Sequence, residues 1–112
     1  MSENFILDAK FEENPVHKGV YMKYLFGKED NDRLSNVEIM IIPGFQISPH
    51  THEDSTEFFY IVGGEGEYLD GDEWKYIKRG DAFKAPKGRT HGIKNTGDGS
   101  LVIFSTFSPG IR

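Results

Sequence analysis

The sequence contains no cysteine among its 112 residues. Disulfide bonds, thiolate nucleophiles and thiolate-ligated metal sites are therefore excluded. It also has no apolar run that approaches the roughly 18 residues of a membrane span, and no charged-then-apolar leader opens it. We therefore expect a cytoplasmic protein that works away from membranes.

Positive charge is scarce and dispersed. The chain carries 13 Lys and Arg residues against 18 Asp and Glu residues, for a net charge of −5, and the basic residues form no run. A surface that binds nucleic acid needs clustered positive charge to neutralise phosphates. We therefore expect no nucleic-acid partner.

Good helix formers are few. Alanine and leucine total only 8 residues, whereas valine, isoleucine, threonine and the aromatic residues total 35. Branched and aromatic side chains pack well on pleated sheets, so this balance excludes helix bundles and favours strands. The 13 glycines and 5 prolines indicate many tight turns. At this length we expect a single all-β domain over residues 1–112, built as a sandwich or barrel.

Turn residues divide the chain into short apolar segments, and we expect eight to ten strands and no helix. The segment 37–42 is nearly all apolar, as expected of a strand covered on both faces. Asp70-Gly71 is a strong hairpin signal, and the polar segment 28–36 has the composition of a mobile loop. A double-sheet jelly roll fits this spacing. The expected strands cover residues 5–11, 20–26, 37–42, 56–62, 65–69, 74–78, 90–95 and 101–107.

Three of the four histidines are candidate metal ligands. His50 and His52 are two residues apart, which in a strand puts both rings on one face. Glu57 begins the next strand, and His91 can converge on the same point if the sheet rolls up. Three imidazoles and one carboxylate suit divalent Fe, Ni, Cu or Zn, with Mn possible. A His-x-His pair is also common in ordinary solvated loops, so the spacing alone leaves that alternative open.

The residues around these candidates form two longer patterns. Residues 44–64 read Gly44-x5-His50-x-His52-x4-Glu57-x6-Gly64, and residues 80–95 read Gly80-x5-Pro86-x-Gly88-x2-His91-x3-Asn95. They resemble the first and second motifs of the cupin superfamily, and from the first to the second they span residues 44–95, almost half of the chain. The resemblance implies a single cupin domain, a double-stranded β-helix (jelly-roll) barrel. It also implies one divalent metal ion, Fe, Mn, Ni, Zn or Cu, bound by His50, His52, Glu57 and His91.

Alternation along the strands suggests which side chains share a pocket with the metal. If Glu57 points inward, Phe59 shares its face, and Ile93 shares the face of His91. The aromatic candidates have core packing as an alternative role. The candidate substrate-pocket residues are Tyr24, Phe59, Ile93 and Ser105.

Three other residues near the motifs have simpler expected roles. By alternation Ser48 should share the face of His50. His17 lies beside a turn, and we expect it to be exposed. We expect Asn95 to make hydrogen bonds in a turn and not to bind the metal. No residue is assigned as catalytic.

The ligand set permits more than one function. An open metal site can support an isomerase, lyase or decarboxylase acting on a sugar acid or keto acid, and with a redox metal it can support a dioxygenase. The alternative is a cupin that binds a small metabolite without turnover. A purely structural metal is a third interpretation. In each of the first two cases the partner is a small molecule.

The end of the chain carries a narrower resemblance. Phe107-Ser108-Pro109, with Arg112 beyond, is similar to the tail of small cupins that process unsaturated uronates from pectin. Those proteins tend to have Asp where this chain has Ser105, and Gln where it has Glu57, which removes groups assigned to catalysis or ligation there. Small cupins also pair through sheet edges or an exchanged N-terminal strand, so Phe5-Ile6-Leu7 is a candidate segment for a homodimer.

Overall fold

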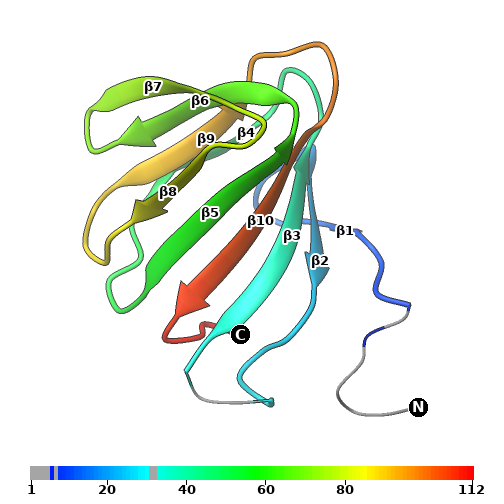
Figure 1. Ribbon diagram of the computed structural model, residues 1–112, viewed down its shortest axis with the longest axis vertical. Helices are drawn as coiled ribbons and strands as arrows, with labels where there is room; N and C mark the ends of the chain where they lie inside the picture. The colour runs from blue at the N-terminus through cyan, green and yellow to red at the C-terminus, as the bar shows by residue number, and fades with distance from the viewer. Residues whose placement is uncertain (1–5, 7, 31–32) are drawn as a thin grey trace.

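The computed structural model describes residues 6, 8–30 and 33–112, and in these ranges it consists of strands and connecting loops without a helix (Figure 1). The described residues accordingly contain no helix that could cross a membrane. The ten strands are β1 (Glu12–Glu13), β2 (Val20–Tyr24), β3 (Ser35–Ile41), β4 (Gln46–His50), β5 (Thr56–Gly63), β6 (Glu65–Asp70), β7 (Glu73–Lys78), β8 (Ala82–Ala85), β9 (His91–Asn95) and β10 (Leu101–Ser108).

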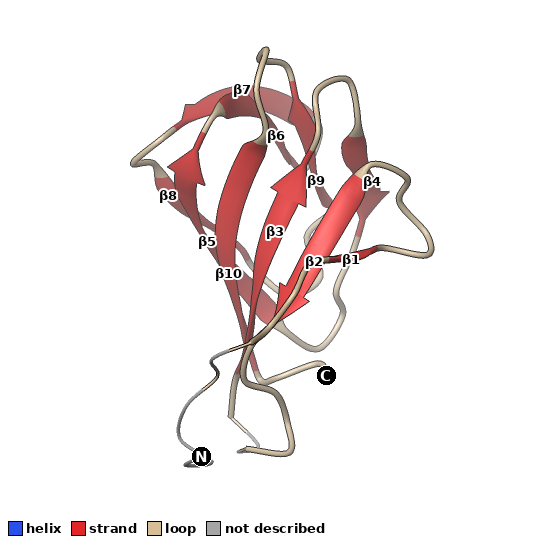
Figure 2. Ribbon diagram, turned by 90° about the vertical axis from the view of Figure 1, so that its right-hand side faces the viewer, coloured by secondary structure: helices blue, strands red, loops and turns tan. Residues whose placement is uncertain are grey.

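Two antiparallel sheets form the molecule. The larger has the order β1-β2-β3-β10-β5-β8 and the smaller the order β4-β9-β6-β7. The chain crosses repeatedly from one sheet to the other, so that β4, β5 and β9 come together although they are far apart in sequence (Figures 1 and 2). The all-β, jelly-roll prediction is confirmed.

Period-two alternation produces the core between the sheets. Along β10 the side chains of Leu101, Ile103, Ser105 and Phe107 are buried, whereas Phe104 on the opposite face is exposed. The same pattern recurs on β3 and β5, whose inward side chains are buried one after the other. The interpretation of 37–42 as a strand covered on both faces was therefore wrong, because its outward side chains are only partly covered.

Two glycine turns set the strand register. The Asp70-Gly71 signal marks a real hairpin, with Asp70 paired to Glu73 around a two-residue loop. Gly71 at the first loop position has φ +71°, the conformation that favours a hairpin with right-handed twist. Gly64 has φ +86°, and a Cβ there would lie 2.5 Å from the carbonyl oxygen of Ser100. Only glycine fits this position between β5 and β6.

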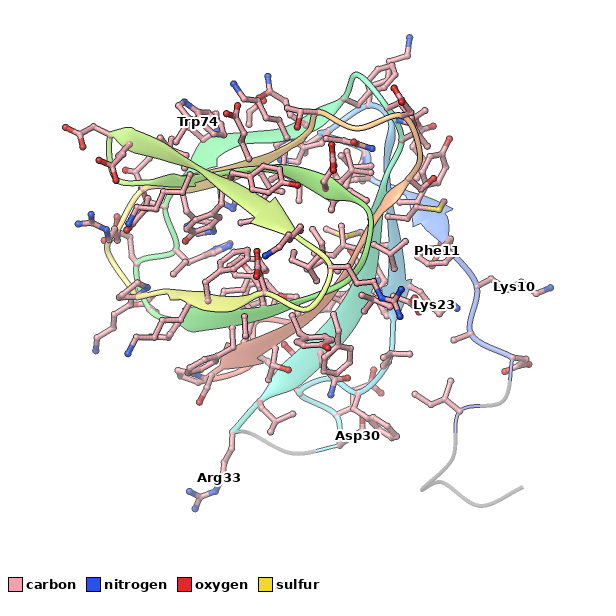
Figure 3. The ribbon with its side chains drawn as sticks, turned by 45° about the horizontal axis from the view of Figure 1, so that its top comes forward. Lys10, Phe11, Lys23, Asp30, Arg33 and Trp74 are labelled. Atoms are coloured by element: carbon pink, nitrogen blue, oxygen red, sulfur yellow. The ribbon has the colours of Figure 1, made fainter. Side chains whose placement is uncertain are left out.

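The expected strands are wrong at the N-terminus and beside the polar loop. Of the segment 5–11, residues 6 and 8–11 form no strand, while residues 5 and 7 lie outside the described residues. Pairing with β2 begins only at Glu12, and Phe11 instead packs under the Lys23 ammonium group, 4.6 Å from the ring centroid (Figure 3). The loop predicted over residues 28–36 ends earlier than expected, because β3 starts at Ser35.

We predict that Ile103→Ala lowers the free energy of unfolding by about 2–5 kcal/mol, because the side chain is fully buried between the sheets and its removal leaves a cavity. Urea denaturation of the metal-free protein measures this. The control Val16→Ala changes a side chain that is 80% exposed and should change stability by less than about 0.5 kcal/mol. Similar effects of the two substitutions would contradict the assigned core.

Candidate metal centre

Four side chains from the two motifs meet at one point. His50 ends β4, His52 follows it, Glu57 lies on β5 and His91 begins β9. One ligand atom from each lies within 4.8 Å of the others. Nε2 of His50 is 3.2 Å from Nε2 of His52, and Oε1 of Glu57 is 3.5 Å from Nε2 of His52 and 3.3 Å from Nε2 of His91. Glu57 and His91 are buried, and the other two are partly buried.

A strand irregularity places His50 in this group. In the β4–β9 pairing Ile47 lies opposite Ile93 and His50 opposite His91, with a register shift between them. Ile47 is buried and Ser48 exposed, so the prediction that Ser48 shares the face of His50 was wrong. An irregularity of this kind re-aims the following side chains, which simple alternation cannot anticipate.

Backbone hydrogen bonds fix the orientation of two of the imidazoles. Nδ1 of His50 donates to the carbonyl of Ser48 at 2.8 Å, and Nδ1 of His91 donates to the carbonyl of Arg89 at 3.2 Å. A carbonyl oxygen only accepts, so in both neutral rings the proton is on Nδ1 and the lone pair of Nε2 faces the centre. Metal-binding histidines typically donate a hydrogen bond in this way from the ring nitrogen that does not face the metal.

Glu57 is held through its second oxygen. Oε2 accepts a hydrogen bond of 2.5 Å from the hydroxyl group of Ser105, which leaves Oε1 toward His52 and His91. Burial by itself raises the pKa of Glu57, but the neighbouring His52, His91 and Ser105 side chains together outweigh it, and the pKa lies below its usual value. The carboxylate is therefore ionised at neutral pH.

The donor set fits a cation. Nε2 of His91 faces Oε1 of Glu57, so two acceptors lie at hydrogen-bonding distance from each other. Nε2 of His50, a third acceptor, faces Nε2 of His52. Such an arrangement needs a proton or a metal cation between the acceptors. Burial lowers the pKa of His50, with the neighbouring His91 and His52 adding to this effect, so a proton is disfavoured there. These four residues can hold a divalent ion with nitrogen and oxygen ligands.

The four side chains also line a cavity of about 540 Å³ between the sheets. Of the candidate pocket residues, Tyr24, Phe59 and Ile93 line it. Ser105 is fully buried behind Glu57 and is not among the described lining residues. The apolar part of the wall also includes Met22, Phe26, Val37, Ile39, Ile47, Phe107 and Ile111.

Two polar residues of the wall have roles that sequence reasoning missed. The guanidinium group of Arg112 stacks on Tyr24, 3.6 Å from the ring centroid. His17 is partly buried and lines the cavity, with its ring centroid 6.1 Å from that of His50. Its Nδ1 accepts a hydrogen bond from the Ser48 amide at 3.4 Å. The expectation that His17 is exposed was wrong, because the turn before β2 folds against the end of β4, a contact that no local sequence signal indicates.

Comparison with known proteins supports the same assignment. A family model described as the cupin domain matches residues 37–107, which is more than half of the chain and includes all four candidate ligands. The chain belongs to the cupin superfamily. Its four-residue cluster is typical of metal sites in this family.

Two curated relatives are similar to this cupin over about 70% or more of both chains. It is 34% identical over 88 residues to the oxalate-binding protein of Thermotoga maritima, covering 77% of this chain and 73% of that one. It is 33% identical over 79 residues to the pectin degradation protein KdgF of Dickeya dadantii, covering 70% and 71%.

Two solved structures are also similar. That of a predicted oxalate decarboxylase from Thermotoga maritima superposes with a TM-score of 0.80 at 30% identity, covering 90% of this chain and 91% of that one. That of KdgF from Halomonas sp. gives a TM-score of 0.80 at 29% identity, covering 92% and 88%.

We predict that metal occupancy falls as the pH is lowered from 7 to 5. Imidazole binds metal only when neutral, and protons compete near and below its ordinary pKa of about 6.5. The lowered pKa of Glu57 keeps the carboxylate ionised over this range, so the imidazoles set the loss. Elemental analysis after dialysis at each pH measures it. Full metal content at pH 5 would argue against a three-histidine site.

We predict that Ser105→Ala weakens metal binding by about 10- to 100-fold, the usual effect of removing a hydrogen bond that orients a ligand. The reason is that Oε2 of Glu57 loses its donor while all four ligands remain. Competition with a chromogenic chelator measures the affinity. Ser100→Ala, an exposed residue just before β10, is the control. Equal affinities of the two variants would show that Ser105 does not hold Glu57.

Proposed function

We propose that this cupin binds one divalent metal ion through His50, His52, Glu57 and His91 and acts as an enzyme on a small carboxylate. The observation that carries the proposal is that all four donors lie on the wall of one cavity. Four protein donors leave two positions of an octahedral ion for a ligand. When bound, the ion supplies a Lewis acid that can polarise a carboxylate or carbonyl oxygen.

The size and charge of the cavity favour a sugar acid or keto acid. A volume of about 540 Å³ exceeds the needs of a dicarboxylate as small as oxalate and lies in the usual range for ligand pockets. Arg112 provides a guanidinium group that can pair with a carboxylate. Stacking on Tyr24 orients this group at the cavity wall.

Apolar side chains form much of the rest of the pocket wall. Met22, Ile47 and Phe107 reduce the water around the bound ligand and strengthen its polar contacts. Phe107 also packs edge-on against His52, with ring centroids 5.2 Å apart. These contacts hold the ligand and the metal donors in one fixed geometry.

We favour a redox-neutral reaction, an isomerisation, a lyase reaction or a decarboxylation. A relative named for pectin degradation and a similar structure described as a predicted oxalate decarboxylase support a sugar acid or keto acid as the substrate class. The pectin-processing cupins tend to have an Asp at the position of Ser105. Here the Ser105 hydroxyl group donates to Glu57 and cannot replace that carboxylate, so their reaction would have to proceed differently in this protein. The ligand set equally accepts iron, and a requirement for O2 would place the protein among dioxygenases.

A direct assay tests this proposal. Protein loaded with Fe, Mn, Ni, Zn or Cu is incubated with unsaturated galacturonate, oxalate and a panel of sugar and keto acids, with and without O2. We predict metal-dependent consumption of a sugar acid or keto acid that persists without O2. Arg112→Gln should raise KM by about 10-fold or more, since a charge-assisted hydrogen bond is lost. Consumption that does not depend on metal would contradict the proposal.

A second function is a binding protein without turnover, and the relative named oxalate-binding protein favours it. Titration calorimetry separates the two functions. Saturable, metal-dependent binding of a carboxylate that is recovered unchanged under every metal and oxygen condition would support the binding protein and exclude the enzyme.

A further inference from the structure

One histidine of the cavity wall belongs to neither sequence motif and is not among the four candidate ligands. His17 is partly buried and lines the same cavity as those ligands. Its ring centroid lies 6.1 Å from that of His50, which is one of them. The ring is therefore close enough to the metal centre to contact a molecule that is bound there.

The turn between β1 and β2 fixes the backbone around His17. The side-chain oxygen of Asn14 accepts hydrogen bonds from the amides of Val16, at 2.8 Å, and His17, at 3.0 Å. An asparagine that bonds to the backbone two and three residues later closes a tight turn. The Asn14 amide also donates to the carbonyl of Val20 at 2.7 Å, and the Val20 amide donates to the carbonyl of His17 at 3.3 Å. The backbone is thus held on both sides of the histidine.

A second set of contacts attaches this turn to the segment between β3 and β4. The Ile42 amide donates to the carbonyl of Gly19 at 3.0 Å. A Cβ at Gly19 would overlap the ring of Phe45, so the turn lies directly against the residue that precedes β4. Because His50 ends β4, these contacts also set the position of His17 relative to the metal centre.

The orientation of the His17 ring leaves one donor for the cavity. Its Nδ1 accepts the hydrogen bond from the Ser48 amide, so the proton of the neutral ring is on Nε2. Within residues 6, 8–30 and 33–112 no other hydrogen bond reaches the ring, and no fully buried polar side-chain atom lacks a partner. Nε2 is therefore not fully buried, and its N–H group is available to a molecule in the cavity that the ring lines.

We propose that His17 contacts the substrate, donating a hydrogen bond from Nε2 to an oxygen of the small acid bound at the metal centre. This inference rests on the proposed function and adds a specificity-determining residue to it. A carboxylate has two oxygens, and a keto or sugar acid has others nearby, so an acid that gives one oxygen to a metal ion keeps further acceptors. An acceptor that is buried without a donor costs free energy, and the neighbouring Met22 and Ile47 offer none.

Two substitutions of His17 separate this role from simple packing. His17→Phe keeps a flat ring in the wall and removes the donor. His17→Gln loses the ring but keeps an amide N–H for the acid and an amide oxygen for the Ser48 backbone. A packing role would be served better by Phe, whereas a hydrogen-bonding role would be served better by Gln.

Titration calorimetry of the zinc-loaded full chain, with pyruvate and galacturonate as probes, measures the effect. We predict that His17→Phe raises the Kd of the acid by about 10-fold or more, and that His17→Gln stays within about threefold of the wild type, because a hydrogen bond to a charged group is lost only in the first variant. Val16→Ala is the matched control, since this side chain in the same turn is 80% exposed, and it should leave the Kd unchanged.

Metal affinity, measured by competition with a chromogenic chelator, should be the same in all three variants and the wild type. Acid binding by His17→Phe that is as tight as in the wild type, or tighter than in His17→Gln, would overturn the inference and leave the proposed function standing. Loss of zinc from His17→Phe would also overturn it, because His17 would then be a metal ligand. A zinc-loaded wild type that binds neither acid would contradict the proposed function itself, and this contact with it.

Discussion

The site depends on one constraint, the convergence of four atoms that can bind a metal ion. Three imidazole nitrogens and a carboxylate oxygen lie within 4.8 Å of one another. The lone pairs of His50 and His91 are directed there by backbone carbonyls behind the rings. A shared cation would relieve the mutual repulsion of these atoms, and the hydrogen bonds behind the rings keep the ligand atoms directed at one point. The four side chains also line the cavity in which we propose that a small carboxylate binds.

The sequence predicted this convergence through its resemblance to the two cupin motifs, because the spacing of His50 and His52 alone left an ordinary solvated loop open. Glycines at the motif ends, such as Gly44 and Gly80, take positive φ and fix where strands begin and end. Alternation then correctly put Phe59 beside Glu57 and Ile93 beside His91. The four donors could therefore be named from the sequence, together with the jelly-roll fold.

Other features lay beyond sequence reasoning because they arise from non-local contacts. The register shift before His50 follows from the pairing of β4 with β9, and it turned Ser48 outward. Ser105 lies on the same inward face of β10 as Ile103 and Phe107, as expected. Its hydroxyl group donates to Glu57, 48 residues away in sequence, and does not line the pocket. His17, in the turn before β2, and Arg112, beyond β10, also line the cavity. No periodic sequence pattern predicts their positions there.

The inward and outward faces of β5 and β10 differ in what they carry. The inward side chains of β5 and β10 include Glu57 and Ser105, whereas their outward neighbours Phe58 and Phe104 are exposed. The central claim remains the metal, and its most direct test is elemental analysis of protein purified without added metal or an affinity tag. The account predicts close to one divalent ion per chain in the wild type and almost none in His50→Ala/His52→Ala. A wild type that binds no ion even when supplied with Fe, Mn, Ni, Zn or Cu, or equal metal content in the variant, would contradict it.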